Sequence, residues 1–582
     1  MVEYKVVENA VLSRPPEGEM IYRTEHPNPQ FERENWRCLN GQWDFEYDQG
    51  KSGEARGMHK PDAEYSLKIN VPFCPESSLS GIGNTDFLNS VWYKRTVDIS
   101  KEELKGRVIL RFGAVDYEAT VFVNGNEAFS HKGGYVGFGG DITDLLTPGE
   151  NVITVRAVDD TRDRMIPSGK QCRWYRSSGC SYTRTTGIWQ TVWLEFVPAA
   201  RILSVKYDTD PGSAVVNIMA KVNGAGTLRA EAFYEGRPVG EAQTDTAGGA
   251  AVLSIKLSER HLWEIGHGRL YDLVLTFGED RVKSYFGLRS VTLDGYRFLL
   301  NGKSVFQRTI LDQGFYPDGI YTAPSDAELE ADIDRSMALG FNGARLHQKI
   351  FEQRFLYHCD RKGYIVWGEF PSWGLDNSEP DTIYGVLPEW LEEVARDYNH
   401  PAIIGWCPFN ETEEDQYRDL VRAVYLATKA ADPTRPVIDT SGYVHVLTDI
   451  FDVHDYEQIP ERFAGHYEKL AEEGKFKYSH EYSQEYAGGQ PIFVSEFGGM
   501  TLSSGDRVWG YSKLDDEEQF YRNYEALVNV LLDNPRIMGF CYTQLTDVEQ
   551  EVNGLYKYDR TPKFDEQRIR AINTRRAAIE DL

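Results

Sequence analysis

The stretch NHPAIIGWCPFNE, residues 399–411, is an apolar run that ends in a polar pair, Asn410 and Glu411. A second stretch, PIFVSEFGG at residues 491–499, has the same form and places Glu496 after its apolar run. Short apolar runs bounded by turn residues are typical of strands that are buried on both faces of a parallel sheet. Each glutamate is therefore expected where a buried strand ends and solvent begins.

The sequence around these stretches alternates between strand and helix patterns from Gly295 onward. We expect strands at 305–311, 342–347, 364–369, 402–410, 436–441, 449–454, 491–496 and 537–544. Amphipathic segments with a helical period lie between most of them. Eight strands alternating with helices over about 290 residues match a (β/α)₈ TIM barrel. An open doubly wound sheet is the alternative, but no glycine-rich phosphate loop follows the first strand.

The residues before the barrel follow a different pattern. From Trp36 to about Val197, short alternating runs separated by turns predict a β-sandwich of two antiparallel sheets, a jelly roll. Residues 201–290 contain about seven more short strands, which predict an immunoglobulin-like β-sandwich without its disulfide. The expected domains are therefore a jelly roll at 1–198, an immunoglobulin-like sandwich at 199–290 and a barrel at 291–582.

The composition disfavours several classes of protein. The 582 residues include 63 Lys and Arg against 90 Asp and Glu, a net charge of −27 that disfavours binding to a phosphate backbone. No run approaches the ~20 apolar residues that span a bilayer, and the first residues lack a secretory-signal pattern. Seven irregularly spaced cysteines argue against a disulfide framework. We therefore expect a cytoplasmic protein that binds neither nucleic acid nor membrane.

The two glutamates indicate a specific chemistry. In a barrel the loops after the strands converge at one face, and Glu411 and Glu496 end the fourth and seventh expected strands, on opposing sides of the ring. Two carboxyl groups that face each other across a sugar-sized opening can hydrolyse a glycoside, one as acid and the other as base or nucleophile. Either glutamate alone is equally consistent with a helix N-terminal charge or an arginine partner. Together they favour a glycoside hydrolase.

Several segments give the chain a resemblance to a known family. They include TVFVNGNEAF (120–129), GGYVGFGGDIT (133–143), RTTGIWQTVWLE (184–195), GFNGARLHQKIFEQRFLYHCDRKGYIVWGE (340–369) and the two stretches quoted first. On these motifs the chain resembles glycoside hydrolase family 2, which includes β-galactosidases, β-glucuronidases and β-mannosidases. The resemblance covers nearly the whole chain. It implies a sugar-binding jelly roll, an immunoglobulin-like domain and a catalytic barrel, in that order.

The resemblance also implies roles for individual residues. Glu411 would be the general acid and base, and Glu496 the nucleophile, of a retaining double displacement. Asn410 would bind the sugar 2-hydroxyl. Tyr456 resembles the tyrosine that holds the nucleophile, a role that His454 would otherwise fill.

Further substrate-binding candidates follow the second and third strands. Arg345 looks like the family's arginine at the mouth, which would keep the nucleophile ionised. His347 and Gln348 stand where many relatives have Ser-His-Tyr-Pro, so the recognition of sugar hydroxyls there is left open. Glu369, which ends the third strand, is also a candidate.

Two more candidates come from opposite ends of the chain. Tyr542, at the end of the eighth strand, aligns with an aromatic sugar platform. Asp141 resembles a residue that reaches the barrel mouth from the first domain. The alternative for Asp141 is a turn or cap residue.

One departure from the family bears on the substrate. β-Glucuronidases carry an Asn-x-Lys pair that clamps the substrate carboxylate, whereas this chain has Glu551, Val552 and Asn553 there. An ionised glutamate would repel a uronate. Lys557 or Arg184 would have to supply a substitute cation.

The favoured interpretation is a retaining exo-β-glycosidase of β-galactosidase type that acts on a carbohydrate substrate. Within the family, the alternatives are β-glucuronidase, β-mannosidase and arabinosidase activity. The alternative outside enzymes is a carbohydrate-binding protein that has lost the chemistry, but both acids are present. We expect no organic cofactor and find no contiguous metal-ligand motif, although acidic loops leave Mg²⁺ or Ca²⁺ open. Homo-oligomer formation is also left open.

Overall fold

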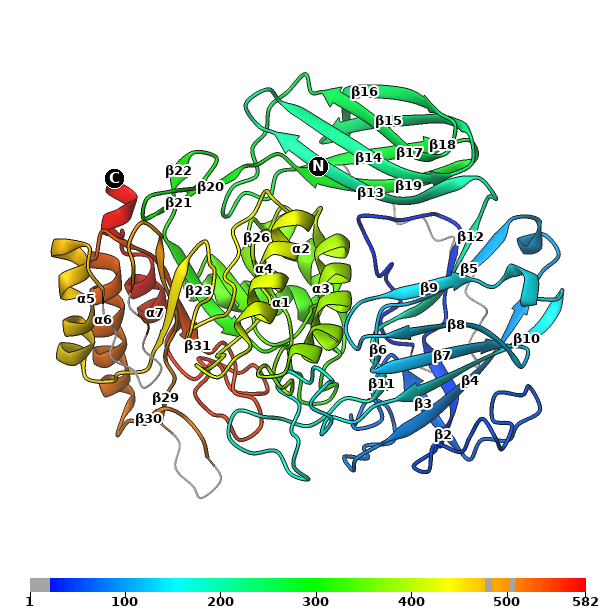
Figure 1. Cartoon of the computed structure of the whole chain (residues 1–582), viewed down its shortest axis with the longest axis horizontal. Helices are drawn as coiled ribbons and strands as arrows, with labels where there is room; N and C mark the ends of the chain where they lie inside the picture. Colours follow the sequence, from blue (N-terminus) through cyan, green and yellow to red (C-terminus); the bar gives the residue numbers. More distant parts are fainter. Residues whose placement is uncertain (1–20, 477–483, 485, 503–507) are drawn as a thin grey trace.

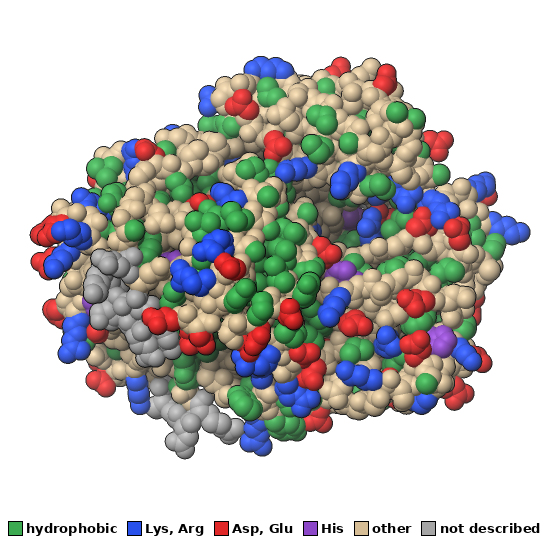
Figure 2. Space-filling model, in the orientation of Figure 1, with side chains coloured by type: hydrophobic (Ala, Val, Ile, Leu, Met, Phe, Trp, Pro, Cys, Tyr) green, Lys and Arg blue, Asp and Glu red, His purple; other side chains and the backbone are tan. Residues whose placement is uncertain are grey.

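A computed structural model of the chain describes residues 21–476, 484, 486–502 and 508–582, which form three parts (Figure 1). Two β-sandwiches precede a barrel of parallel strands wrapped by helices. The fold confirms the predicted class. Figure 2 shows acidic and basic side chains interspersed over one face, with a hollow below the second sandwich.

The first sandwich is built from a four-stranded and a six-stranded antiparallel sheet. The smaller sheet has the order β1 (Trp36–Cys38), β12 (Val192–Val197), β5 (Arg107–Phe112) and β9 (Phe138–Asp141). The larger has the order β3 (Leu67–Val71), β2 (Gly41–Tyr47), β4 (Ser90–Ile99), β10 (Gly149–Val158), β7 (Glu118–Val123) and β8 (Asn126–Lys132). A short pair, β6 (Val115–Asp116) and β11 (Gly187–Ile188), lies beside them. Alternating buried side chains from both sheets form one hydrophobic core. Residues 1–20 of the predicted domain lie outside the described residues.

The second sandwich packs a three-stranded sheet against a four-stranded one, as expected for an immunoglobulin-like fold. The sheets have the orders β13 (Arg201–Asp210), β14 (Val215–Asn223), β17 (Gly249–Lys256) and β16 (Arg237–Thr246), β15 (Gly226–Tyr234), β18 (Leu270–Phe277), β19 (Asp280–Gly287). The predicted domain boundaries fall in the connections between β12 and β13 and between β19 and β20 (Val291–Asp294). With β21 (Arg297–Leu300) and β22 (Lys303–Ser304), β20 forms a small sheet that leads into the barrel.

Seven parallel strands form the ladder of the barrel wall. They are, in order around the sheet, β26 (Ile403–Cys407), β25 (Ile365–Glu369), β24 (Gly343–Leu346), β23 (Gln307–Asp312), β31 (Ile537–Thr543), β28 (Ile492–Gly498) and β27 (Phe451–Asp455). These strands match seven of the eight predicted segments. The expected strand at 436–441 is less regular, because it forms only two isolated parallel bridges to the β26 region, Trp406 to Val437 and Asn410 to Ser441.

Helices surround the strands and bury one face against them. They are α1 (Asp326–Ala338), α2 (Gln353–Lys362), α3 (Ile383–Asp397), α4 (Arg418–Ala431), α5 (Pro460–Glu473), α6 (Glu517–Asp533) and α7 (Glu566–Asn573). The ends of some helices follow directly from the sequence: the Ser325 side chain accepts a hydrogen bond from Glu328 N at the start of α1. At the end of α2, Gly363 adopts the left-handed conformation that closes the helix.

The barrel mouth carries additions from elsewhere in the chain. A short parallel pair, β29 (Met500–Thr501) and β30 (Ser512–Lys513), follows β28. The connection from β10 to β11, residues 159–186, leaves the first sandwich and runs to the barrel (Figure 1). There Ser168 N donates to Trp373 O at 2.8 Å, and Gln550 Nε2 donates to Gly179 O at 2.7 Å. The first sandwich therefore contributes to the surroundings of the mouth.

A cavity of about 200 Å³ lies where the three parts meet, and Arg111, Trp193, Val205 and Asn399 are among its lining residues. None of the predicted catalytic or substrate-binding residues lines it. We therefore place no chemistry there. In the part of the chain that the structure describes, no helix is long and apolar enough to cross a membrane.

Three buried carboxyl groups lie in the first sandwich and its loops. Glu76, Asp116 and Asp159 each have one buried side-chain oxygen without a hydrogen-bond partner among the described residues. Burial, strengthened by the charge of Glu76, raises the pKa of Asp159 to about 8. Burial also raises the pKa of Glu76 to about 7. These carboxyl groups are therefore destabilising when they ionise.

Replacing Asp159 by asparagine is expected to raise the Tm at about pH 8.5 and to change it little at about pH 5. The folded pKa of Asp159 lies above its unfolded value of about 3.9, so the folded state keeps a proton that the unfolded chain releases. Stability is therefore present below the unfolded pKa and falls as the pH rises toward 8. Asparagine avoids this loss, which amounts to about 4 kcal/mol between pH 5 and pH 8.

Thermal unfolding of Asp159→Asn at both pH values measures this effect. Asp62→Asn, an exposed change in the same sandwich, is the control. A Tm for Asp159→Asn below that of the unchanged protein at the higher pH would contradict the prediction.

Candidate active site

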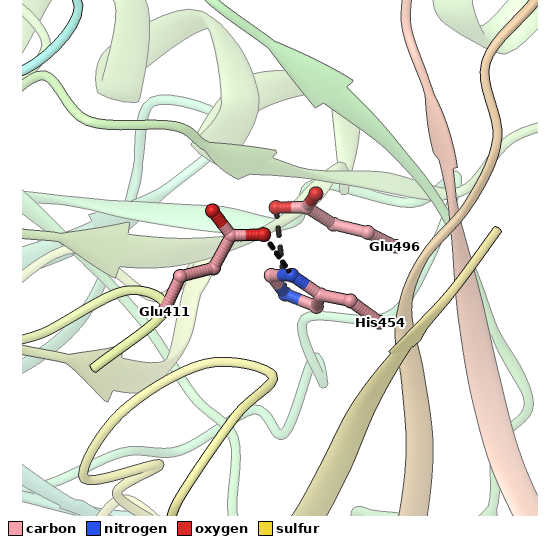
Figure 3. Close-up of side chains that lie close together, drawn as sticks. All are labelled: Glu411, His454 and Glu496. Carbon is pink, nitrogen blue, oxygen red and sulfur yellow. Dashed lines mark hydrogen bonds and ion pairs between the residues drawn. The ribbon is translucent and has the colours of Figure 1, made fainter. Parts of the chain in front are cut away.

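The two predicted catalytic glutamates face each other at the barrel mouth (Figure 3). Glu411 follows β26 and Glu496 lies in β28, and one side-chain atom from each lies within 4.8 Å of the other and of His454. His454, from β27, lies between them, with Nδ1 2.8 Å from Glu411 Oε1 and Nε2 3.4 Å from Glu496 Oε1. Retaining glycosidases hold their carboxyl groups about 5–5.5 Å apart, whereas inverting enzymes need roughly 6.5–9.5 Å. The close approach favours retention.

These three side chains also have the spacing of metal ligands. Among the described residues, they are the one group of at least three His, Cys, Asp or Glu side chains whose donor atoms lie close enough to share an ion. The contact with Glu411 already engages Nδ1 of His454. The arrangement is accounted for by acid–base chemistry alone.

The backbone places Glu411 in a conformation that few side chains adopt. Its φ is +52°, in the left-handed region, where a residue other than glycine is strained. The irregular segment 436–441 holds it there, because Glu411 N donates to Ser441 O at 2.8 Å and Ser441 N donates to Phe409 O at 2.9 Å. Strain that is held in this way is common at functional sites.

The surroundings of Glu496 keep it ionised. Burial alone would raise its pKa, but the opposing charges of His454, Arg345 and His347 lower it well below the usual range. Arg345 Nη1 donates to Glu496 Oε1 at 3.0 Å, and Tyr456 OH donates to Oε2 at 2.5 Å. An ionised, hydrogen-bonded carboxylate is what a nucleophile requires. The predicted contacts of Arg345 and Tyr456 with the nucleophile are present, and His454 contacts it as well.

Arg345 is the centre of a buried polar network. Its guanidinium is 1% exposed and also donates to Glu369 Oε2 at 2.6 Å and to Asn410 Oδ1 at 3.0 Å. Burial would raise the pKa of Glu369, but Arg345 and His347 lower it to about 2. Both oxygens of Glu369 bond to the chain itself. Glu369 therefore positions Arg345 instead of binding substrate as predicted.

Two side chains in this network keep a nitrogen that makes no hydrogen bond among the described residues. Because Asn410 Oδ1 accepts from Arg345, its amide nitrogen points elsewhere, and Nδ2 is buried without a hydrogen-bond partner among the described residues. A sugar hydroxyl could accept from it, as predicted for the 2-hydroxyl. His347 Nδ1 lies 2.9 Å from Glu369 Oε1, which leaves Nε2 for a substrate hydroxyl. Burial lowers the pKa of His347, although the neighbouring Glu369 and Glu496 oppose the shift.

Three other residues that were predicted to bind substrate, Gln348, Tyr542 and Asp141, contact other parts of the chain instead. Gln348 is fully buried, with Oε1 accepting from Trp373 N and Nε2 donating within the chain. Tyr542 is fully buried and packs on Tyr524 of α6, because its neighbour Thr543 takes the inward position and contacts Tyr456. Alternation along a strand allows only one of the two to face the mouth.

Asp141 does not reach the mouth either. It lies in β9, where it accepts from Arg107 Nε at 2.7 Å and from Thr143 Oγ1 at 2.6 Å. Its ionic and hydrogen-bond partners in the described structure, Arg107, Thr143 and Arg201, all belong to the two sandwiches. The alternative of a turn or cap residue is the one that the structure supports.

Lys170 and Trp373 were not predicted from the sequence. Lys170, in the loop that follows β10, is 5% exposed and holds its Nζ 3.8 Å from the centroid of the Trp373 ring. Burial lowers its pKa, but nearby Cys180, Glu551, Glu496 and Glu411 raise it overall. The signal in the sequence was the length of this loop, since long connections within a compact domain are often functional.

The family's carboxylate clamp is replaced by an acidic network. Glu551 accepts from Tyr182 OH and from Asn553 Nδ2, the latter at 3.1 Å. Neither proposed substitute cation replaces the clamp lysine. Lys557 is exposed, and Arg184 donates to the backbone carbonyls of residues 85, 172 and 174.

Comparison with known proteins agrees with this architecture. Residues 62–194 match the sugar binding domain of glycosyl hydrolases family 2, and residues 297–574 match the TIM barrel domain of the same family. The chain is 27% identical to the β-glucuronidase of Sus scrofa and 24% identical to that of Homo sapiens, each match covering 84% of this chain and 80% of the relative.

Solved structures give the same result for the fold. The β-glucuronidase of Ruminococcus gnavus in complex with D-glucuronic acid superposes with a TM-score of 0.77 at 20% identity, over 94% of this chain and 99% of that one. The β-glucuronidase of Lactobacillus rhamnosus gives 0.78 at 20% identity, over 95% and 100%. With two domain matches that together span more than half of its length, the chain belongs to glycoside hydrolase family 2 and is a glycoside hydrolase.

Proposed function

We propose that the chain is a retaining exo-β-glucuronidase. Glu496 attacks the anomeric carbon while Glu411 gives its proton to the departing oxygen, which leaves a glycosyl ester on Glu496. Glu411 then takes a proton from water, which attacks the same carbon and releases the sugar with its configuration retained. Arg345 and Tyr456 bond to the nucleophile, and Asn410 Nδ2 is free to bind the adjacent sugar hydroxyl.

The relatives reported above are named β-glucuronidases, and they do not support the predicted β-galactosidase activity. They favour the alternative. A glucuronide requires a cation, and Lys170 can supply it. Among the described residues, Lys170 Nζ contacts the face of the Trp373 ring but makes no hydrogen bond or ion pair. The charges of Glu551, Glu496 and Glu411 stabilise the Lys170 cation, but among the described residues no carboxylate lies within ion-pair distance of its Nζ, so a carboxylate that arrives with the substrate would be its first direct partner. The proposal rests on the buried position of Lys170 near the two glutamates.

The acidic network around Glu551 is compatible with this proposal. Burial is the largest effect on Glu551 and raises its pKa, although Lys170 opposes the shift. Both oxygens of Glu551 accept hydrogen bonds within the chain, from Tyr182 and Asn553, and are therefore not aimed freely at a substrate carboxylate. The repulsion that the sequence suggested is therefore reduced in the folded protein.

Replacing Lys170 by glutamine is expected to lower kcat/KM for 4-nitrophenyl β-D-glucuronide by about 10- to 100-fold, mainly through KM. The reason is the loss of a charge-assisted contact that holds the carboxylate in the ground state and the transition state alike. Lys170→Arg should retain part of the activity, since it keeps the charge.

Lys557→Gln, which removes an exposed cation in the segment after β31, serves as the control and should change little. Assays of the unchanged protein on 4-nitrophenyl glucuronide, galactoside, mannoside and arabinoside test the sugar itself. Faster hydrolysis of a neutral glycoside than of the glucuronide would overturn the proposal. Cytoplasmic location and homo-oligomer formation stay predictions.

A further inference from the structure

A second hollow near the mouth is not explained by the contacts of the cleaved sugar. It is a cavity of about 890 Å³ between the loop that follows β10 and the segments on either side of β31. Its lining includes Tyr175, Arg176 and Ser178 from the first sandwich and Trp509, Glu549 and Gln550 from the barrel. Its size lies within the range of about 300–1,000 Å³ that is usual for ligand sites.

The two walls of this cavity are fastened to each other. Gln550 Nε2 donates to the carbonyls of Gly179 at 2.7 Å and Ser181 at 3.0 Å. Thr183 N donates to Glu549 Oε1 at 2.9 Å. These bonds cross from the barrel to the loop of the first sandwich. The cavity is therefore a preformed site and not a loose gap between domains.

The cavity lies beside the catalytic pair. The Trp509 ring is 4.8 Å from the Tyr511 ring, which stacks at 3.4 Å on Tyr456, and Tyr456 OH bonds to Glu496. Glu411 is close by, since one of its side-chain oxygens lies within 4.8 Å of a side-chain oxygen of Glu496. The cavity thus lies next to the side chains that surround the catalytic pair.

The position of the acid decides which part of a substrate belongs there. In a retaining glycosidase the acid protonates the oxygen of the leaving group, so the leaving group departs on the side of the acid. We infer that this cavity binds the leaving part of the substrate, and that this part is itself a sugar. The inference rests on the acid–base role of Glu411 and not on which terminal sugar is cleaved.

The lining has the chemistry that a sugar requires. Tyr175, 64% exposed, and the half-buried Trp509 offer ring faces for the apolar side of a pyranose. Serine and threonine hydroxyls, with the carboxylate of Glu549 and the guanidinium of Arg176, offer partners for its hydroxyls. The cavity combines apolar faces with many polar groups, which suits a saccharide better than a purely aromatic group.

The test compares two substrates that differ only in the leaving group. One is a disaccharide in which β-D-glucuronic acid is linked to a hexose, and the other is β-D-glucuronyl fluoride, whose leaving group is too small to occupy the cavity. Tyr175→Ala and Trp509→Ala should each lower kcat/KM for the disaccharide about tenfold and leave that for the fluoride within about twofold. The readout is the ratio of kcat/KM for the disaccharide to kcat/KM for the fluoride. A residue with only a structural role would lower both values and leave this ratio unchanged.

Trp174→Ala is the matched control, because Trp174 is 73% exposed in the same loop but does not line the cavity. Equal losses on both substrates, no loss on either, or the same ratio change in Trp174→Ala would overturn the inference. Tyr175→Ala is the safer variant for folding, since its side chain is exposed. If the enzyme does not cleave glucuronides, the disaccharide and the fluoride are made with the terminal sugar that it does cleave. A failure of the proposed function is then seen separately from a failure of this inference.

Discussion

Replacing Glu496 by alanine is expected to lower kcat by about four orders of magnitude or more for every aryl glycoside that the enzyme hydrolyses. The carboxylate that forms the covalent intermediate is lost, and no neighbouring group takes its place, because Arg345 and Tyr456 are hydrogen-bond donors to it. Added azide should enter the space that the side chain leaves and attack the anomeric carbon directly. The product is then the α-glycosyl azide, since one inversion replaces two.

Glu413→Ala, an exposed change two residues after the acid, is the control and should keep normal activity. Steady-state rates and nuclear magnetic resonance of the azide product give the measurement. Hydrolysis that persists in Glu496→Ala without azide, or a β-glycosyl azide as its product, would remove Glu496 as the nucleophile.

Replacing Glu411 by alanine should have an effect that depends on the leaving group. For poor leaving groups, which need a proton as they depart, we expect kcat/KM to fall by about 10²- to 10⁴-fold. For an activated leaving group such as dinitrophenolate, the first step should survive and the glycosyl ester on Glu496 should accumulate. Azide should then release the β-glycosyl azide, because it attacks the ester from the opposite face.

A series of aryl glycosides of graded leaving-group acidity measures this dependence. The two variants are expected to give glycosyl azides of opposite configuration. The products therefore assign the roles of Glu411 and Glu496 without any comparison of rates. An equal loss across the series would show that Glu411 does not act as the acid.

Much of the fold follows from local patterns. Alternation of buried strands and amphipathic helices after Gly295 predicts the barrel, and the structure has strands within a few residues of seven expected positions. The eighth segment, 436–441, bridges its neighbour at only two points, because it also has to hold Glu411 in its strained conformation. Helix α3 begins at Ile383, earlier than Pro388 suggests, since tertiary packing tolerates the proline in the second turn.

The sequence predicts those site residues that lie in or near the ends of the barrel strands. Glu496 and Arg345 meet at the mouth because they lie in strands of the wall, and Glu411 joins them because it closely follows β26. Tyr542 was misplaced because the phase of alternation on its strand is not visible when both faces are buried. Lys170 could not be found in this way, because it comes from a loop of another domain and its place depends on docking.

The pairing of β23 with β31 has a consequence for how the enzyme is made. These are the first and last strands of the wall, and Ile310 pairs with Tyr542 across more than two hundred residues. During translation, β23 has an unsatisfied edge until β31 leaves the ribosome, and such edges invite association between chains. A truncated product that stops before Ile537 contains both glutamates but cannot complete the ring. Activity should therefore appear only after β31 has left the ribosome.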